Sequence, residues 1–220
     1  DWSSDVCSSD LHQTSDIETS PADSARNLGV IFDHDFKFRS HVAQVCRACF
    51  YHMRDIHRIR RYLSLDNAKT LAHAFVTSRL DYCNSLLFNI ADKDLNRLQR
   101  IQNCLARVVT KSPPRTRSIP LLQRLHWLPV KFRVQFKINL LTFKTLSTSQ
   151  PSYLRNLLTV STSRQSECRG GGTLLSIPRV KTKTGSRGFR SSAPTLWNAL
   201  PLGVRCAPTV PTFRKRLKTH

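Results

Sequence analysis

Acidic side chains are nearly missing from the second half of this 220-residue chain, where Glu167 is the single acid after residue 94. Residues 95–220 hold 24 Lys and Arg, whereas residues 1–94 hold 11 basic and 13 acidic side chains. In total, 35 Lys and Arg stand against 14 Asp and Glu, which gives a formal net charge of +21. Because solvated protein surfaces usually mix both signs of charge, this excess predicts that the second half binds a polyanionic partner.

Long apolar runs and a cysteine framework are missing as well. No stretch approaches the roughly 18 apolar residues of a membrane span, and no basic start is followed by an apolar secretory segment. The seven cysteines are scattered and include one CxxC, which suits a reducing compartment better than a disulfide scaffold. We therefore expect an intracellular protein, nuclear or cytoplasmic, that is not secreted and has no membrane partner.

Motifs of nucleophilic catalysis are also missing. The chain contains no GxSxG, no HExxH and no glycine-rich phosphate loop followed by lysine. Asp33 and Asp35 form the only close acidic pair behind a predicted strand, and two such carboxylates can hold Mg²⁺. The dipeptide His34-Asp35 is more typical of a turn. We therefore expect no complete active site, no cofactor and no small-molecule substrate.

One cysteine and histidine cluster has residue types that bind metals. Cys46-x-x-Cys49-x-x-His52, with His57 close behind, contains possible zinc ligands. A zinc site draws its ligands from a turn or from separate elements, whereas these four residues share one predicted helix. A thioredoxin-like CxxC needs a strand before it and a helix that begins at it, and that context is missing. The pattern therefore predicts two cysteines packed in the core, and no metal site.

Composition divides the chain into segments. Residues 1–11 have no helical or strand period and no initiator Met, and they resemble a translated sequencing adapter. Residues 27–33 predict one buried strand, and residues 161–192, rich in Ser, Thr, Gly and Arg, predict a mobile stretch. The expected fold class is mainly α, a small amphipathic helical bundle after one N-terminal strand, with a basic, partly irregular C-terminal extension. The expected segments are an artefactual or disordered N-terminus (1–24), a strand and turn (25–39), a helical bundle (40–111), a Trp-containing helical segment (112–160) and a basic, largely flexible tail (161–220) with a short ordered island at 193–201.

Basic residues form stripes on the predicted helices. Apolar residues recur at three- and four-residue steps in helices expected to begin near Ser40, Asp66, Asp92 and Val130. Arginines and lysines form a second stripe on these helices, which suits contact with phosphates, and nearby aromatic side chains suit base stacking. No base-reading motif is present, so backbone-led binding is expected. The predicted nucleic-acid-binding residues are Arg47, Arg54, Arg58, Arg61, Arg97, Arg100, Arg107, Lys111, Lys131, Arg133, Lys137 and Trp127.

Several short blocks also suggest a family origin. They are LGVIFD (28–33), SRLDYCNSLL (78–87), LQRIQN (98–103), LHWLPV (125–130), PSYL (151–154) and APTLWNALP (193–201). In this order they resemble the region behind the palm of LINE-type non-LTR retrotransposon reverse transcriptases. The resemblance covers the chain from about residue 25 to its end.

The resemblance implies thumb-like helices over residues 40–111, which touch a template–primer duplex, and a basic C-terminal extension over residues 112–220. The family's polymerase chemistry uses Mg²⁺-binding aspartates of the palm, one of them in a Tyr-Ala-Asp-Asp-type motif, and this sequence does not contain that motif. We therefore expect a fragment of an RNA-directed DNA polymerase that is not an enzyme as it stands. Its residual role would be non-sequence-specific binding of RNA, DNA or an RNA/DNA hybrid.

Other interpretations stay open. The chain could be a non-enzymatic helical module that binds an acidic protein, or an unfolded relic of a decayed element. Residues 25–64 also resemble a short N-terminal segment of AlkB-like tRNA-modifying proteins, which combine a dioxygenase with a methyltransferase. A dioxygenase needs two histidines and one carboxylate on a β-sandwich, and a methyltransferase needs a glycine-rich strand–turn–helix. The sequence has neither, so we expect neither activity.

Overall fold

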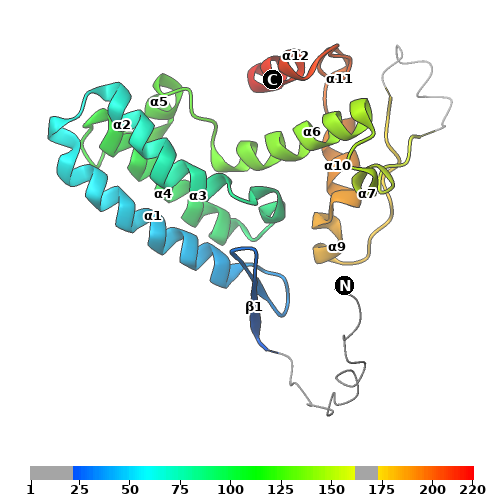
Figure 1. The fold of residues 1–220 in the computed structure, drawn as a ribbon, viewed down its shortest axis with the longest axis horizontal. Coiled ribbons are helices and arrows are strands. Elements are labelled where there is room, and N and C mark those ends of the chain that lie inside the picture. The colour runs from blue at the N-terminus through cyan, green and yellow to red at the C-terminus, as the bar shows by residue number, and fades with distance from the viewer. Residues whose placement is uncertain (1–21, 162–172) are drawn as a thin grey trace, which may run out of the picture.

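The computed structural model describes residues 22–161 and 173–220 and is mainly helical, with a short two-stranded sheet near the start (Figure 1). The expected mainly α fold class is confirmed. Within these two ranges, no helix is both long and apolar enough to cross a membrane. Nearly all of the segment predicted as an artefactual or disordered N-terminus (1–24) lies outside the described residues.

The sheet is a β-hairpin of β1 (Ser24–Asn27) and β2 (Val30–Asp33), which pair antiparallel. Leu28 and Gly29 form its two-residue turn, with φ angles of 46° and 81°. Two positive φ angles are typical of a type I′ turn, whose twist matches that of the strands, and glycine adopts them most easily. The prediction of one strand over residues 27–33 is therefore wrong, because the turn falls inside the apolar run.

The helix α1 (Arg39–Ile59) follows the hairpin directly. Asp33, the last residue of β2, caps it, since its Oδ2 accepts hydrogen bonds from the backbone N–H groups of Arg39 (2.6 Å) and Ser40 (3.4 Å). The sequence suggested Ser40 as the cap, but Ser40 lies in the first turn of the helix. The carboxylate of Asp33, six residues before Arg39, thus fixes the start of α1.

Three helical segments form an up–down–up bundle. The descending segment consists of α2 (Leu65–Ala72), the π-helical turn η2 (His73–Thr77) and α3 (Ser78–Asp81), and α4 (Asp92–Thr110) then ascends beside α1. Two 3-10 turns, η1 (Arg60–Tyr62) and η3 (Asn84–Leu87), lie at the corners. Small and branched apolar residues fill the interior, and those with no exposed surface include Val42, Cys49, Ala68, Ala72, Val76, Ile101, Leu105 and Val109.

The bundle is extended by α5 (Ser118–Arg124), which packs on α4, and by α6 (Val130–Thr148). Side chains of α4 hold the start of α6, because Gln102 Nε2 donates to Leu128 O (2.8 Å) and Gln99 Oε1 accepts from the Val130 N–H (2.9 Å). From there α6 leads away from the bundle, and α7 (Ser152–Arg155) follows it (Figure 1). The predicted helix starts at Asp92 and Val130 are confirmed.

A second, smaller core surrounds the far end of α6. It is built by α9 (Lys183–Arg187), α10 (Phe189–Asn198), α11 (Leu202–Arg205) and α12 (Val210–Thr219). The ring of Phe213 stacks on that of Phe143, with centroids 4.3 Å apart, and Trp197 lies 6.0 Å from Phe213. Phe213 has no exposed surface, and 3% of Trp197 is exposed.

This core differs from the expected, largely flexible tail of residues 161–220, although the predicted ordered island at 193–201 overlaps α10. Helices occupy most of residues 183–219, and they pack on α6 and on one another. The apolar residues that hold them are few and lie among many Ser, Thr, Gly and Arg residues, so composition alone indicated flexibility. Part of the predicted mobile stretch, residues 162–172, lies outside the described residues.

Candidate nucleic-acid interface

The helices α1 and α4 lie side by side and run in the same direction. Near their starts, Cys46 lies close enough to Asp94 and Arg97 for both charges to act on its pKa. Near their ends, the Arg60 guanidinium donates from Nε (2.9 Å) and Nη2 (2.6 Å) to the carbonyl oxygen of Val109. Because both helices rise equally per residue, each α1 residue lies level with the α4 residue about 49 positions further along.

The predicted stripe on α1 forms one exposed line. At 100° per residue its four members fall within an arc of about 60°, and they extend over roughly 21 Å along the helix and into η1. Arg58 makes an exposed ion pair with Asp55 (3.6 Å). The stripe consists of Arg47, Arg54, Arg58 and Arg61, all of them exposed.

The predicted stripe on α4 follows the edge of that helix that borders α1. Arg97 pairs with the buried Asp94 (3.3 Å), and Arg107 Nε donates to Thr116 O (2.9 Å), so both are partly buried. Arg100 and Lys111 are exposed. Together the stripes form what we call the α1–α4 basic face, made of Arg47, Arg54, Arg58, Arg61, Arg97, Arg100, Arg107 and Lys111.

The two stripes meet where the helices end. Arg61, Arg107 and Lys111 line one pocket of about 570 Å³, together with His57. In the part of the chain that the structure describes, Arg58 and Arg97 are the members of the face that form ion pairs with carboxylates. Within residues 22–161 and 173–220, the other six members form no ion pair with an acid.

Arg60 is a structural arginine that the sequence analysis did not single out. Its side chain is 7% exposed, and its guanidinium donates to Val109 O and, from Nη1, to Leu63 O (2.7 Å). A cation at the end of α4 also suits the negative end of the helix dipole. Arg60 directly precedes Arg61 in the same basic run. The two arginines differ only in the direction in which they leave the helix, so nothing in the sequence indicated that Arg60 is buried and Arg61 exposed.

The predicted residues on α6 do not join the α1–α4 basic face. Lys131 and Lys137 are exposed, but Arg133 makes a two-pronged ion pair with Asp81 that ties α6 to α3, with Nε 2.8 Å from Oδ1. Trp127 was expected to stack on bases, and most of its ring is buried. Its side chain is 7% exposed and packs edge-on against His73, so its ring serves as core.

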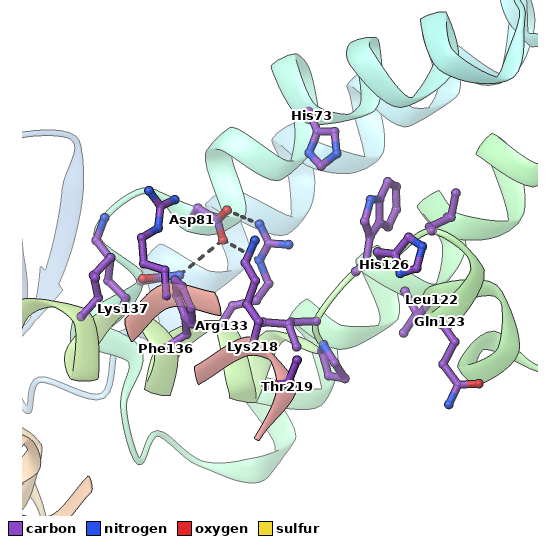
Figure 2. A pocket seen from close by; sticks show the side chains of 17 residues that line it. His73, Asp81, Leu122, Gln123, His126, Arg133, Phe136, Lys137, Lys218 and Thr219 are labelled. Carbon is purple, nitrogen blue, oxygen red and sulfur yellow. Dashed lines mark hydrogen bonds and ion pairs between the residues drawn. The ribbon is translucent and has the colours of Figure 1, made fainter. Parts of the chain in front are cut away.

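A larger cavity of about 990 Å³ lies between the start of α6, the α5–α6 connection, α3 and α12. Figure 2 shows Arg133, Phe136 and Lys137 toward one end and Leu122, Gln123 and His126 toward the other. Its α12 wall includes Arg214 and Lys218, which the sequence analysis did not propose. These two residues lie four apart and therefore on one face of the helix. Burial and then the Arg133 charge lower the pKa of His73, which keeps this lining histidine neutral at pH 7.

The cysteine and acidic clusters have structural roles. Cys46 and Cys49 are buried in the bundle core, as predicted, and burial raises the pKa of the Cys49 thiol to about 12. Both thiols are therefore protonated and poor nucleophiles. Among the residues in 22–161 and 173–220, no three His, Cys, Asp or Glu side chains gather where they could hold a metal ion. Asp33 caps α1, and Lys37, paired with Asp35, lowers the pKa of Asp35.

No protein-family model, no curated protein and no solved structure matches the chain.

Proposed function

We propose that this chain binds RNA, DNA or an RNA/DNA hybrid through the phosphate backbone, without sequence specificity, on the α1–α4 basic face. The observation that carries the proposal is the parallel course of two basic stripes on adjoining rigid helices. Six members of these stripes have no carboxylate partner among the residues that the structure describes. Phosphates are the ligand that such a surface neutralises best, and each neutralised phosphate releases bound counterions.

The register of the two helices supports this proposal further. Because α1 and α4 run parallel, Arg47 lies level with Arg97 and Arg61 lies level with Lys111, so the face carries cations at both ends. The α1 stripe alone is roughly 21 Å long, which matches several phosphates along one nucleic-acid strand. The exposed Tyr51, 60% accessible and one turn from Arg47, adds an aromatic ring at its edge.

The proposal includes a family origin. The chain is a thumb and C-terminal region of a LINE-type reverse transcriptase, an RNA-directed DNA polymerase whose catalytic aspartates are not in this sequence. In that origin the bundle contacts the template–primer duplex, and Mg²⁺ belongs to the palm alone. What supports it is the order of the sequence blocks together with the basic surface of the helices that follow the first block. The chain itself would then bind nucleic acid inside the cell without catalysing a reaction.

A salt titration tests this function. Binding of the full chain to a fluorescently labelled RNA/DNA hybrid is measured by anisotropy, and six neutralised phosphates predict a log–log slope of about −5. Arg47→Gln/Arg54→Gln/Arg61→Gln should lower the affinity at least tenfold and reduce the slope by about 3. Affinity that does not change with salt would disprove the proposal.

The matched control removes the same number of charges elsewhere. Arg179→Gln/Lys181→Gln/Lys183→Gln alters three exposed residues of the C-terminal region, and we expect it to keep most of the affinity and slope. Equal losses in both triple variants would mean that net charge, rather than the α1–α4 basic face, controls binding. Labelled polyglutamate tests the other class of partner, because equal affinity for it would indicate a module for acidic proteins.

A further inference from the structure

The 990 Å³ cavity beside α12 shares no lining residue with the α1–α4 basic face. It forms where α12 runs back along α6, from the Phe213–Phe143 stack toward the start of α6. The side of the cavity that α12 supplies therefore exists only when this helix is docked. Its volume lies in the range of pockets that take one small organic ligand.

One part of this cavity carries excess positive charge. Lys137 of α6 and Arg214 and Lys218 of α12 have no carboxylate within ion-pair distance in residues 22–161 and 173–220. Asp81 is the one acid in the lining, and Arg133 already holds it with two hydrogen bonds. Three uncompensated cations around one cavity repel one another, and a bound anion removes that repulsion.

The rest of the cavity is suited to a flat heterocycle. Leu122 and Leu125 supply apolar surface. The exposed Gln123 and His126 supply polar groups at the same end as Leu122 (Figure 2). Purine and pyrimidine bases have apolar faces and hydrogen-bonding edges, and they pack against such walls.

A buried acceptor lies near the charged part of the cavity. Asn84 is 4% exposed, and its Nδ2 donates to Asp81 Oδ1 (3.4 Å). Its Oδ1 has no hydrogen-bond partner among the residues that the structure describes. Because a buried acceptor without a donor costs free energy, a hydroxyl group next to the bound anion would stabilise this arrangement.

We propose that this cavity binds a nucleoside monophosphate. Its phosphate lies between Lys137, Arg214 and Lys218, its base packs against the Leu122 and Leu125 wall, and a ribose hydroxyl donates to Asn84 Oδ1. The cavity is a second site, independent of the backbone binding proposed for the α1–α4 basic face.

Equilibrium dialysis of the full chain against AMP, adenosine and inorganic phosphate tests the proposal. We expect one saturable AMP site per chain, with adenosine and inorganic phosphate each at least tenfold weaker, because either lacks one half of the ligand. Lys218→Gln and Arg214→Gln should each weaken AMP binding at least fivefold. Adenosine that binds as tightly as AMP, or phosphate that competes as well as AMP, would overturn the nucleotide assignment.

Lys215→Gln is the matched control, since it removes one charge from the same helix at an exposed residue outside the cavity lining. It should leave AMP affinity within twofold, and an equal loss in Lys215→Gln and Lys218→Gln would overturn the site. The affinity for the RNA/DNA hybrid should stay within twofold in Lys218→Gln. Loss of AMP binding alone therefore points to this cavity, and loss of hybrid binding alone points to the α1–α4 basic face. Circular dichroism of each variant checks that α12 is still helical.

Discussion

The bundle and the C-terminal region bury their apolar residues in opposite ways. In the bundle, core residues recur at helical spacing along each long helix. In the C-terminal region, Trp197 of α10 and Phe213 of α12 pack on Phe143 of α6, which lies more than 50 residues earlier in the chain. A period reveals the first kind of core in the sequence, whereas the second exists only after the chain has folded back onto α6.

The two regions also arrange their positive charge differently. On the bundle, each stripe belongs to a single helix, so its geometry follows from the spacing of residues such as Arg47 and Arg54. In the cavity, Lys137 and Lys218 come from different helices, and only the docking of α12 brings them to one place. Each stripe thus depends on local structure, whereas the cavity depends on tertiary structure.

The largest effect is expected where the C-terminal core depends on one side chain. Phe213→Ala removes a ring with no exposed surface that stacks on Phe143 at 4.3 Å. The lost packing and the remaining cavity should lower the free energy of unfolding of the C-terminal region by about 3–5 kcal/mol. Native-state hydrogen exchange should then show faster exchange of α10 and α12 amides, while α1 and α4 amides stay protected.

Phe132→Ala is the control for that substitution. Phe132 lies on α6 but is 53% exposed, so its truncation should change stability by no more than about 0.5 kcal/mol. If Phe213→Ala exposed α1 and α4 amides as strongly as those of α12, the bundle and the C-terminal region would unfold as one cooperative unit. They would then not be two separate cores.

The features that depend on residues within one helix were predicted from the sequence, and several others were not. The starts of α4 and α6 and the burial of Cys46 and Cys49 were predicted, because each depends on residues within one helix. The hairpin turn was missed because Leu28-Gly29 lies inside an apolar run that also fits a single strand. The predicted ordered island at 193–201 overlaps α10, but α9 and α11 were missed because such short helices show no apolar period.

For the candidate sites, residues could be named from the sequence, but the way in which they come together could not. The stripe residues could be listed from the sequence, yet the parallel register of α1 and α4 that joins them could not. Trp127 was assigned to stacking because an aromatic residue in a basic segment gives no sign of whether it is buried. Arg214 and Lys218 were visible only as a basic end of the chain, and their part in a cavity depends on the Phe213 contact.

A smaller effect is expected from the buried arginine that closes the bundle. Arg60→Met keeps the length of the side chain but leaves the carbonyl oxygens of Val109 and Leu63 without their donors. Buried acceptors without donors should lower the free energy of unfolding by about 2 kcal/mol, measured by urea denaturation. Arg61→Met removes the same charge from an exposed neighbour and should cost no more than about 0.5 kcal/mol. Equal losses would mean that the charge, rather than the hydrogen bonds, stabilises the bundle.

The smallest effect is expected from pH, and it concerns the joint between the hairpin and α1. His41 is 5% exposed, and burial lowers its pKa against the opposing influence of Asp33. The unfolded chain therefore takes up a proton near pH 6.5, whereas folded His41 does so only at lower pH, so the free energy of unfolding falls as pH drops below 6.5. His41→Gln should flatten this slope between pH 7 and 5 in urea denaturation, leaving the part that His73 contributes with the same sign. His34→Gln changes an exposed residue in the turn between β2 and α1 and should keep the full slope. A slope that stays unchanged in His41→Gln would show that protonation of His41 does not destabilise the joint between the hairpin and α1.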